Sequence, residues 1–296
     1  MQIYKVKFNI DSPTLTPFQS DTIFGHLCWI IVRQEGVKGL RDFLKPFKEG
    51  SPPFIISDAF PGDLLPKPFS ADFLDEKPDK NIKSTTWVSP EDFDRIRQGK
   101  RPVFPNPVEL GFKSFSTTHS CISRLTNTTG EDSLYSLKEI VAEPYLSLYL
   151  KVISVEWKDK VIDLLTRLSR AGYGRKKSIG KGQFNIGEIP HPYSFNEIKD
   201  ANGFVTLSNF CPAEFDPTEG FYKIFVKYGK LGEEFTFCGN PFKRSLIMLR
   251  TGSVFKTEGA PKEYYGRLVG DGIAPAKPEV VQYAYAFSVP LRYPEF

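Results

Sequence analysis

Apolar and polar residues alternate from Tyr4 to Ile10 at the start of the chain. Because successive side chains of a strand point to opposite faces, this spacing of two predicts a half-buried strand. A segment rich in Pro, Ser and Thr follows and ends at Ser20, a candidate helix N-cap. Apolar residues then recur at helical spacing over Ile23–Ile31, and Gly36 is placed as a stop signal. A second, shorter helix is predicted over Val37–Phe47.

The same kinds of pattern predict the other main elements of the first 189 residues. Strands are expected over Phe54–Ala59, Tyr145–Val155 and Gln183–Ile189. A helix over Trp157–Leu168 has its apolar residues on one face. When the long segment between the second and third strands is set aside, the order of elements is β-α-β-β-α-β. This is the ferredoxin-like or RRM-type arrangement.

Residues 60–140 form a long insertion in this arrangement. Charged residues and prolines dominate the stretch Ser70–Pro107, which predicts a segment outside the core with one short helix around Pro90–Gln98. The stretch Phe112–Glu131 is rich in Ser and Thr and has a basic centre. We therefore expect a loop or an extended hairpin there.

The character of the chain changes after residue 189, because helical signals become weak and strand patterns recur. The predicted strands are Phe204–Phe210, Tyr222–Tyr228, Glu234–Cys238, Ser245–Phe255 and Val280–Val289. We therefore expect an α+β protein with an N-terminal domain over residues 1–189 and a sheet-rich C-terminal domain over residues 190–296. One interpretation of the second domain is that it is a degenerate copy of the first.

Composition and charge fit such a protein. The 296 residues include 26 Phe and 13 Tyr but only 2 Met, which favours a core of aromatic and β-branched residues. The net charge of +4 is only mildly basic and does not indicate a partner by itself. No apolar run is long enough to cross a bilayer, and the start of the chain lacks the pattern of a signal peptide. A cytoplasmic location without membrane contact is therefore expected.

Cysteine and histidine are too scattered to indicate chemistry. The 4 cysteines lie far apart, without a CxxC pair or a zinc-binding spacing. The 3 histidines have no companion cluster of carboxylates. We therefore predict no disulfide framework, no metal site, no cofactor and no catalytic constellation.

The strongest chemical signal is the basic Gly-rich loop over residues 171–183. Six basic residues and no acidic residue stand between Leu164 and Gly187. Glycines let the backbone approach a ligand closely, and backbone N–H groups beside lysines suit phosphates. The P-loop and GxGxxG spacings are both missing, so a polyphosphate backbone such as RNA fits better than a single nucleotide, with a flexible surface loop as the alternative. The candidate RNA-binding residues here are Gly172, Tyr173, Gly174, Arg175, Lys176, Lys177, Ser178, Gly180, Lys181 and Gly182.

A second candidate segment begins at His119 and offers an imidazole, an Arg and several hydroxyl groups to phosphates or bases. We consider His119, Ser123 and Arg124 candidate RNA contacts, with an ordinary polar loop as the alternative. Catalysis by His119, alone or with Cys121 as the nucleophile, is disfavoured because no Asn or Asp is evident to orient the imidazole.

Two further positions remain open to more than one interpretation. His26 lies one position from the apolar face of the first predicted helix, and a surface or core histidine is preferred there to a general base. Lys243 and Arg244 open a predicted strand of the second domain. This basic pair either extends a groove that binds an RNA backbone or solvates a surface.

Several of these segments together resemble the RAMP proteins of type III-A CRISPR interference complexes. The resemblance follows nearly the whole chain in order. The segments that carry it are Thr16–Leu27, Ser57–Pro61, Leu65–Pro68, His119–Thr126, Gly172–Phe184, Pro241–Leu249, Gly252–Phe255 and Gln282–Phe287. One departure is Ser120, where the pattern of the family has Asn after the His.

The resemblance implies two ferredoxin-like (RRM-like) domains and a structural role without catalysis. Such subunits cap the foot of the effector complex and hold the repeat-derived 5′ handle of the crRNA. They contact the large polymerase-like subunit on one side and the first backbone RAMP subunit on the other. A hairpin or thumb displaces a nucleotide next to the handle, and His119–Thr129 is the candidate for that element. Handle contacts are then expected from the Gly-rich loop and from the loop that ends at Ser20.

Two other functions remain as alternatives. One is a metal-independent endoribonuclease that processes crRNA, with His26 or His119 as the general base. The other is a protein-interaction scaffold that touches little RNA, in which the Gly-rich loop serves a neighbouring subunit.

Overall fold

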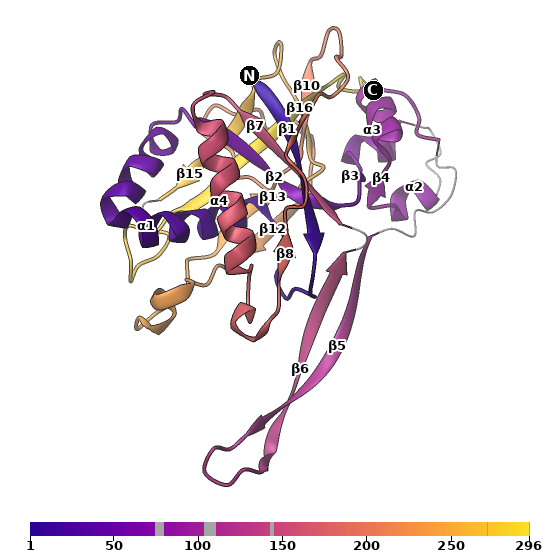
Figure 1. The fold of residues 1–296 in the computed structure, drawn as a ribbon. Helices are drawn as coiled ribbons and strands as arrows, with labels where there is room; N and C mark the ends of the chain where they lie inside the picture. Colours follow the sequence, from indigo (N-terminus) through magenta and orange to yellow (C-terminus); the bar gives the residue numbers. More distant parts are fainter. Residues whose placement is uncertain (75–79, 104–110, 143–144, 271, 296) are drawn as a thin grey trace.

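Two antiparallel sheets form the frame of the molecule (Figure 1). This computed structural model describes residues 1–74, 80–103, 111–142, 145–270 and 272–295 of the chain. The first sheet uses strands from residues 2–193, and the second uses strands from residues 203–291. Each half of the chain therefore contributes one main sheet.

The first sheet has the strand order β2–β7–β1–β8, and β9 also pairs with β1. Its chain order, β1-α1-β2-β7-α4-β8, confirms the β-α-β-β-α-β order predicted for the first half. The alternation in β1 buries Val6 and Phe8 completely. The elements are β1 (Gln2–Ile10), α1 (Ser20–Lys48), β2 (Phe54–Pro61), β7 (Leu146–Val152), α4 (Trp157–Ala171), β8 (Phe184–Asn185) and β9 (His191–Tyr193).

The long helix α1 contains the break that Gly36 predicted. Gly36 has φ +70° and ψ −169°, outside the helical region, so two helical segments meet at a kink. The N-cap is Gln19, and Ser20 is the first helical residue. The N–H of Ser20 donates to a carboxylate oxygen of Asp58 at 2.8 Å, so a distant strand caps the helix. The prediction of Ser20 as the N-cap is therefore wrong by one residue.

The predicted insertion forms two separate structures. The first is a lobe beside the sheets, and its helix α3 confirms the helix predicted around residues 90–98 (Figure 1). The prediction that this segment lies outside the core is wrong, because Val88, Phe93 and Ile96 belong to the main apolar core. Its elements are β3 (Leu65–Pro66), η1 (Phe69–Phe73), α2 (Lys80–Ser84), β4 (Trp87–Val88) and α3 (Pro90–Arg97). Residues 75–79 and 104–110 of the predicted insertion lie outside the described residues.

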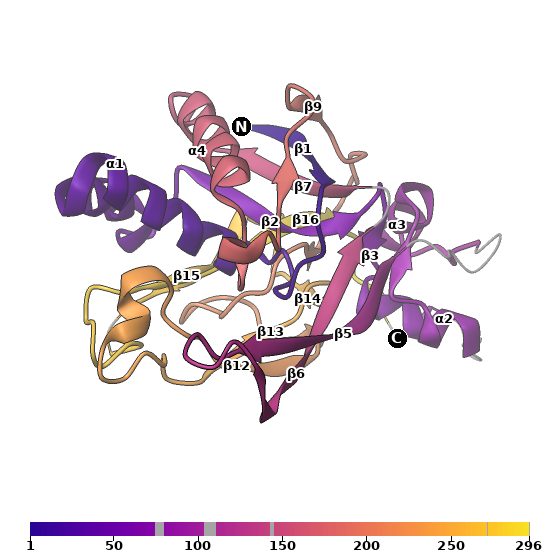
Figure 2. The same ribbon diagram turned by 60° about the horizontal axis from the view of Figure 1, so that its bottom comes forward.

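The second structure is the hairpin of β5 (Phe112–Ile122) and β6 (Thr129–Ala142), which confirms the hairpin alternative for this segment. The hairpin projects from the body of the molecule as a long two-stranded arm (Figures 1 and 2). Its base is fixed by a β-bridge between Thr14 and Ile140. Beyond that base, Ile122 and Leu125 expose 65% and 96% of their surface, so the end of the arm contributes little to the core.

The second half of the chain is rich in strands, as predicted. Its main sheet has the order β11–β14–β10–β16–β15, and β12 and β13 form a separate two-stranded ribbon. The elements are β10 (Gly203–Thr206), β11 (Gly220–Phe221), β12 (Ile224–Lys227), η3 (Glu233–Phe237), β13 (Leu246–Leu249), β14 (Val254–Lys256), β15 (Tyr264–Val269) and β16 (Gln282–Leu291). The strand predicted over residues 234–238 is wrong, because this segment is the 3₁₀ helix η3. The strand β15 was not expected.

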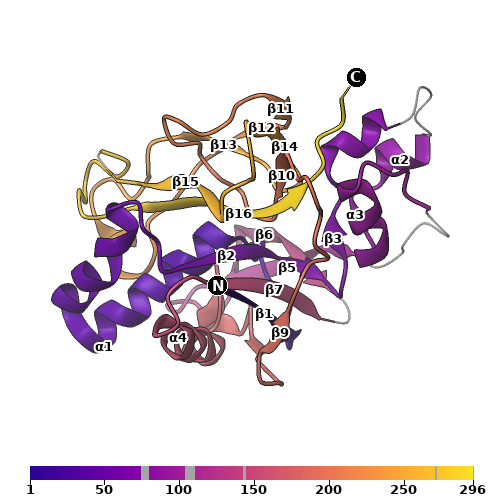
Figure 3. The ribbon, with the colours of Figure 1, turned by 90° about the horizontal axis from the view of Figure 1, so that it is seen from above.

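The two sheets pack face to face, with α4 on the far side of the first sheet (Figure 3). One continuous apolar core includes Leu150 of β7, Leu165 of α4 and Phe287 of β16. The second sheet therefore covers the face of the first sheet that its own helices leave open. The two halves of the chain share this core. The domain boundary at residue 189 therefore remains a prediction, and so does the ferredoxin-like nature of the second half.

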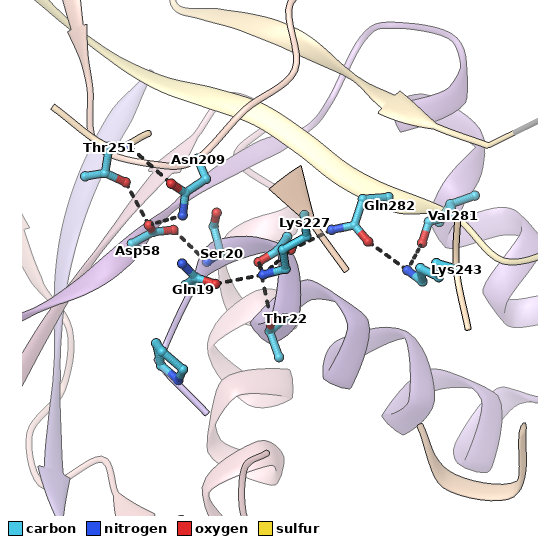
Figure 4. A network of polar contacts seen from close by, with 12 residues as sticks. Gln19, Ser20, Thr22, Asp58, Asn209, Lys227, Lys243, Thr251, Val281 and Gln282 are labelled. Atoms are coloured by element: carbon cyan, nitrogen blue, oxygen red, sulfur yellow. Dashed lines mark hydrogen bonds and ion pairs between the residues drawn. The ribbon is translucent and has the colours of Figure 1, made fainter. Parts of the chain in front are cut away.

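A polar network ties the start of α1 to the second half of the chain (Figure 4). The buried carboxylate of Asp58, next to a bulge in β2, accepts hydrogen bonds from Asn209 and Thr251, each at 2.7 Å. Burial raises the pKa of Asp58 to about 6, although the hydrogen bonds from Ser20 and Thr251 favour the ionised form. The carboxylate of Asp21 pairs with Lys227 at 2.9 Å. These contacts fix the first turn of α1 and the segment just before it. That segment contacts the Gly-rich loop.

Candidate nucleic-acid interface

The Gly-rich loop begins at the end of α4 and closes on itself. The N–H of Tyr173 donates to the carbonyl oxygen of Gly182 at 2.9 Å, and the N–H of Gly182 donates to the carbonyl oxygen of Pro13. Gly182 has φ +66°, and a Cβ atom there would lie 2.0 Å from the carbonyl oxygen of Tyr173. Only glycine fits this close approach of two backbone segments. We call this paired segment, Tyr173 and Gly182, the neck of the loop.

The segment before α1, residues 16–18, packs against the loop. The ring of Tyr173 stacks on Phe18 with a centroid distance of 4.0 Å, and its hydroxyl donates to the carbonyl oxygen of Pro17 at 2.6 Å. Thr16 accepts a hydrogen bond from the N–H of Arg175. Tyr173 is fully buried, as is Ser20. Both side chains are candidate RNA contacts by sequence, and the structure corrects this because both are buried: Tyr173 packs the loop on the segment before α1, and Ser20 lies in the first turn of α1.

His26 supports the same loop. Its Nε2 atom accepts a hydrogen bond from the N–H of Gly174 at 3.1 Å. Burial and the nearby charge of Lys177 lower the pKa of His26 to about 4. The imidazole is thus neutral near pH 7 and has its acceptor nitrogen occupied, which makes it a poor general base in this arrangement.

The structure divides the cations of the loop into two groups. Lys181 donates to the carboxylate of Glu139 at 2.7 Å, and Lys177 donates to the carboxylate of Glu233. Arg175 and Lys176 are exposed, and the Lys176 ammonium lies 5.6 Å from the ring centroid of Tyr135. Carboxylates therefore already pair with two of the four candidate cations, and the other two are exposed.

The exposed backbone of the loop has a shape suited to anions. Lys176 has φ +63° and ψ +21°, in the left-handed region, and the right-handed 3₁₀ turn η2 (Lys177–Ile179) follows directly. Such a change of hand turns successive N–H groups toward one side and forms a concave anion site. Ser178 and Gly180 are exposed in and directly after this turn. Gly172, at the start of the Gly-rich loop, is buried.

The base of the hairpin lies against the loop. The side chain of Glu139, on β6, is fully covered and contacts Thr117, His119 and Lys181. Burial raises the pKa of Glu139, but hydrogen bonds from Lys181 and Thr117 outweigh this and hold it below its ordinary value. The His119 ring stacks on Tyr135, its cross-strand neighbour, at a centroid distance of 5.5 Å. Two segments predicted separately from the sequence thus meet at one site.

Other candidate residues lie apart from this site. Ser123 and Arg124 are exposed in the turn at the end of the hairpin. Lys243 points inward, where it donates to the carbonyl oxygen of Val281 and to Gln282 (Figure 4). Its role as an RNA contact is corrected, because its ammonium serves these internal acceptors. Arg244 is exposed.

The sequence-based selection missed Glu139, Glu233, Tyr135 and Thr16. Thr16 opens one of the segments that carry the resemblance but was not selected, and Glu139 and Glu233 lie 42 and 56 residues from the lysines they pair with. In the part of the chain that the structure describes, no group of three His, Cys, Asp or Glu residues is arranged to hold a metal ion. Among those same residues, no helix has both the length and the apolar character needed to cross a membrane.

Known structures resemble this chain over its whole length, whereas no family model and no curated protein matches its sequence. The Csm1–Csm4 cassette in complex with cA3 contains a chain that matches with a TM-score of 0.66 and 16% identity. The cassette in complex with pppApA gives 0.65 and 18%. The Csm3–Csm4 subcomplex of the type III-A CRISPR-Cas interference complex gives 0.64 and 15%. Each comparison covers 100% of both chains. The chain therefore has the fold of these solved structures, in which Csm4 is the subunit common to both kinds of complex.

Proposed function

We propose that this chain is a non-catalytic, crRNA-binding subunit of a type III-A CRISPR effector complex. It holds the repeat-derived 5′ handle of the crRNA and bridges the large polymerase-like subunit to the first backbone RAMP subunit. In this proposal the protein is cytoplasmic, and both halves of the chain are ferredoxin-like domains. The function belongs to antiviral defence by RNA-guided interference.

The observation that carries the proposal is the meeting of the Gly-rich loop with the hairpin. Arg175 and Lys176 present charge beside a concave row of backbone N–H groups, which is the chemistry that a phosphate chain requires. The rings of His119 and Tyr135 stack on each other, and the Lys176 ammonium lies 5.6 Å from the Tyr135 ring centroid, so aromatic faces that can stack on unpaired bases are within reach of the loop's side chains. Backbone binding and base contact are thus available side by side.

The likeness to the solved structures supports the choice of complex. Those structures are assemblies of Csm4 with Csm1 or with Csm3, so a protein of this fold is known to join two different subunits. The 5′ handle, rather than the guide, is assigned as the bound part of the crRNA because the resemblance of the sequence to type III-A RAMP proteins implies it.

The first test is a pull-down of the tagged chain from its native host at mild salt concentration. We expect short RNAs with one shared, repeat-derived 5′ end, together with a large polymerase-like protein and a backbone RAMP protein. The matched control is the double variant Arg175→Ala/Lys176→Ala, which should retain the proteins but lose most of the RNA. RNA-free complexes from the unmodified chain would overturn the proposal in favour of a scaffold.

A separate assay examines the absence of catalysis. The full chain is incubated with repeat RNA in the presence of EDTA, and the products are separated on a denaturing gel. We expect intact RNA, because the acceptor nitrogen of His26 is occupied by Gly174. Cleavage at one position that disappears in His26→Ala or His119→Ala would instead establish the endoribonuclease.

A further inference from the structure

We propose that Glu139 and Glu233 determine which cations of the Gly-rich loop contact RNA. By holding Lys181 and Lys177 in internal ion pairs, they leave Arg175 and Lys176 as the loop's phosphate contacts. The inference rests on the proposed RNA-binding function. In this proposal Glu139 and Glu233 limit the sequence-independent affinity of the loop for RNA. Lys177 and Lys181 then stabilise the conformation of the loop and do not contact RNA.

The pair of Lys181 and Glu139 is enclosed. The Glu139 side chain is fully covered, and that of Lys181 is only 19% exposed. If Lys181 moved to an RNA phosphate, Glu139 would keep only Thr117 and the imidazole of His119 as polar partners. The carboxylate would lose its ion pair and its shortest charged contact, so we expect the pair to persist in the complex.

The pair of Lys177 and Glu233 has additional support. Glu233 belongs to η3 in the second half of the chain and also accepts a hydrogen bond from Arg33 of α1. Its side chain is 16% exposed. Burial raises the pKa of Glu233, but the hydrogen bond and charge of Lys177, followed by the charge of Arg33, outweigh this and keep it low. Three parts of the chain therefore meet at one ionised carboxylate.

The two pairs attach the loop to different parts of the chain. Glu139 ties it to the hairpin, and Glu233 ties it to the second half and to α1. Arg175 and Lys176, which directly precede Lys177 in the chain, are exposed. The loop is thus fixed in shape, and the cations that fix it are separate from the cations that remain available to a ligand.

The number of phosphate contacts can be measured from the effect of salt. For single-stranded RNA, each released counterion changes the slope of log K against log salt concentration by about 0.7. We would use the full chain and a fluorescein-labelled oligouridylate of about 15 nucleotides, with anisotropy recorded over a series of salt concentrations. Glu139→Gln should release one lysine and steepen the slope by about 0.7, and Glu233→Gln, which frees both Lys177 and Arg33, should steepen it by about 0.7 to 1.4.

The matched control is Glu219→Gln. Glu219 pairs with Lys256 at 3.6 Å on the second sheet, so this variant makes the same change in net charge and also releases a lysine. We expect the control to leave the slope unchanged. The proposal is overturned if the two loop variants leave the slope unchanged, or if the control steepens it equally.

A second set of variants avoids buried unpaired charges. The neutral double variant Glu139→Gln/Lys181→Met should keep the wild-type slope, and Glu233→Gln/Lys177→Met should steepen it by no more than the freed Arg33 adds, about 0.7. Arg175→Met and Lys176→Met should each reduce the slope by about 0.7. A reduced slope in the double variants would overturn the inference. If the unmodified chain binds no oligouridylate, RNA binding itself fails. If the slopes follow expectation but handle RNA binds no better than oligouridylate, only the handle assignment fails.

Discussion

The Nε2 atom of His26 accepts a hydrogen bond from the backbone N–H of Gly174 at 3.1 Å. An imidazole can accept at this nitrogen only while the nitrogen carries no proton. The contact therefore requires neutral His26, and burial together with Lys177 lowers its pKa to about 4. The loop that we assign to RNA thus depends on the protonation state of a residue on α1.

The first prediction concerns stability between pH 4 and 6.5. The unfolded chain binds a proton at His26 below about pH 6.5, whereas the folded chain does so only near pH 4. Stability from neutral His26 is therefore fully present above pH 6.5 and is lost as the pH falls to about 4. The loss should reach about 3 kcal/mol, and it should be absent in His26→Gln.

Urea unfolding of the wild type and of His26→Gln at several pH values measures this effect as a difference. The difference is needed because Asp58, whose pKa is raised to about 6, contributes a pH dependence of opposite sign over much of the same range. Parallel pH profiles for the two proteins would contradict the role of His26.

A second prediction uses two glycines of the same loop. Gly182 and Gly180 have φ +66° and +84°, but only Gly182 is crowded, since a Cβ there would meet the carbonyl oxygen of Tyr173. Gly180→Ala should cost about 1 kcal/mol for its left-handed backbone alone. Gly182→Ala should cost clearly more, roughly 2–4 kcal/mol, because two backbone segments must also separate. Denaturant unfolding measures both, and equal losses would show that the neck is not rigid.

The sequence predicted the first half of the fold well because its signals are local. Alternation in β1, helical spacing in α1 and the stop at Gly36 each depend on neighbouring residues, and the structure contains all three. The same method failed at residues 234–238, where polar and apolar residues also alternate. Phe235 there packs edge-on against Trp29 of α1, so a tertiary contact holds the segment as a 3₁₀ helix.

The candidate site was predicted in part for a related reason. Composition revealed the Gly-rich loop and its cations, but not which cations are paired. The carboxylates of Glu139 and Glu233 reach the loop only because the hairpin and the second half fold against it. Burial of Tyr173 follows likewise from packing on Phe18, which no local pattern shows. Partners that are distant in sequence are therefore the part that sequence reasoning missed.

A third prediction concerns the arm of the hairpin. Replacing residues 121–133 by Asn-Gly would join the cross-strand neighbours Ser120 and Leu134 by a two-residue turn. The midpoint of urea unfolding should stay within error of the wild type, because Ile122 and Leu125 in the removed segment are exposed. The salt slope for RNA should fall by at most about 0.7, from the loss of Arg124. A stability loss above about 1 kcal/mol would show that the arm packs on the body.

The last prediction concerns Lys243, whose ammonium donates to the carbonyl oxygen of Val281 and to Gln282. Burial lowers its pKa from 10.5 to about 8, so the unfolded chain binds more protons between these values. Stability from this group therefore rises by about 3 kcal/mol as the pH increases from 8 to 10.5, relative to Lys243→Met. Unfolding measured at both pH values tests this rise.

The same variant separates an internal lysine from an RNA contact. Because the Lys243 ammonium is already held by internal acceptors, Lys243→Met should leave the salt slope for oligouridylate unchanged. Arg244→Met, at the exposed neighbouring position, is the matched comparison. A slope that falls by about 0.7 in Lys243→Met would restore Lys243 as a phosphate contact, and it would require the ammonium to leave Gln282 when RNA binds.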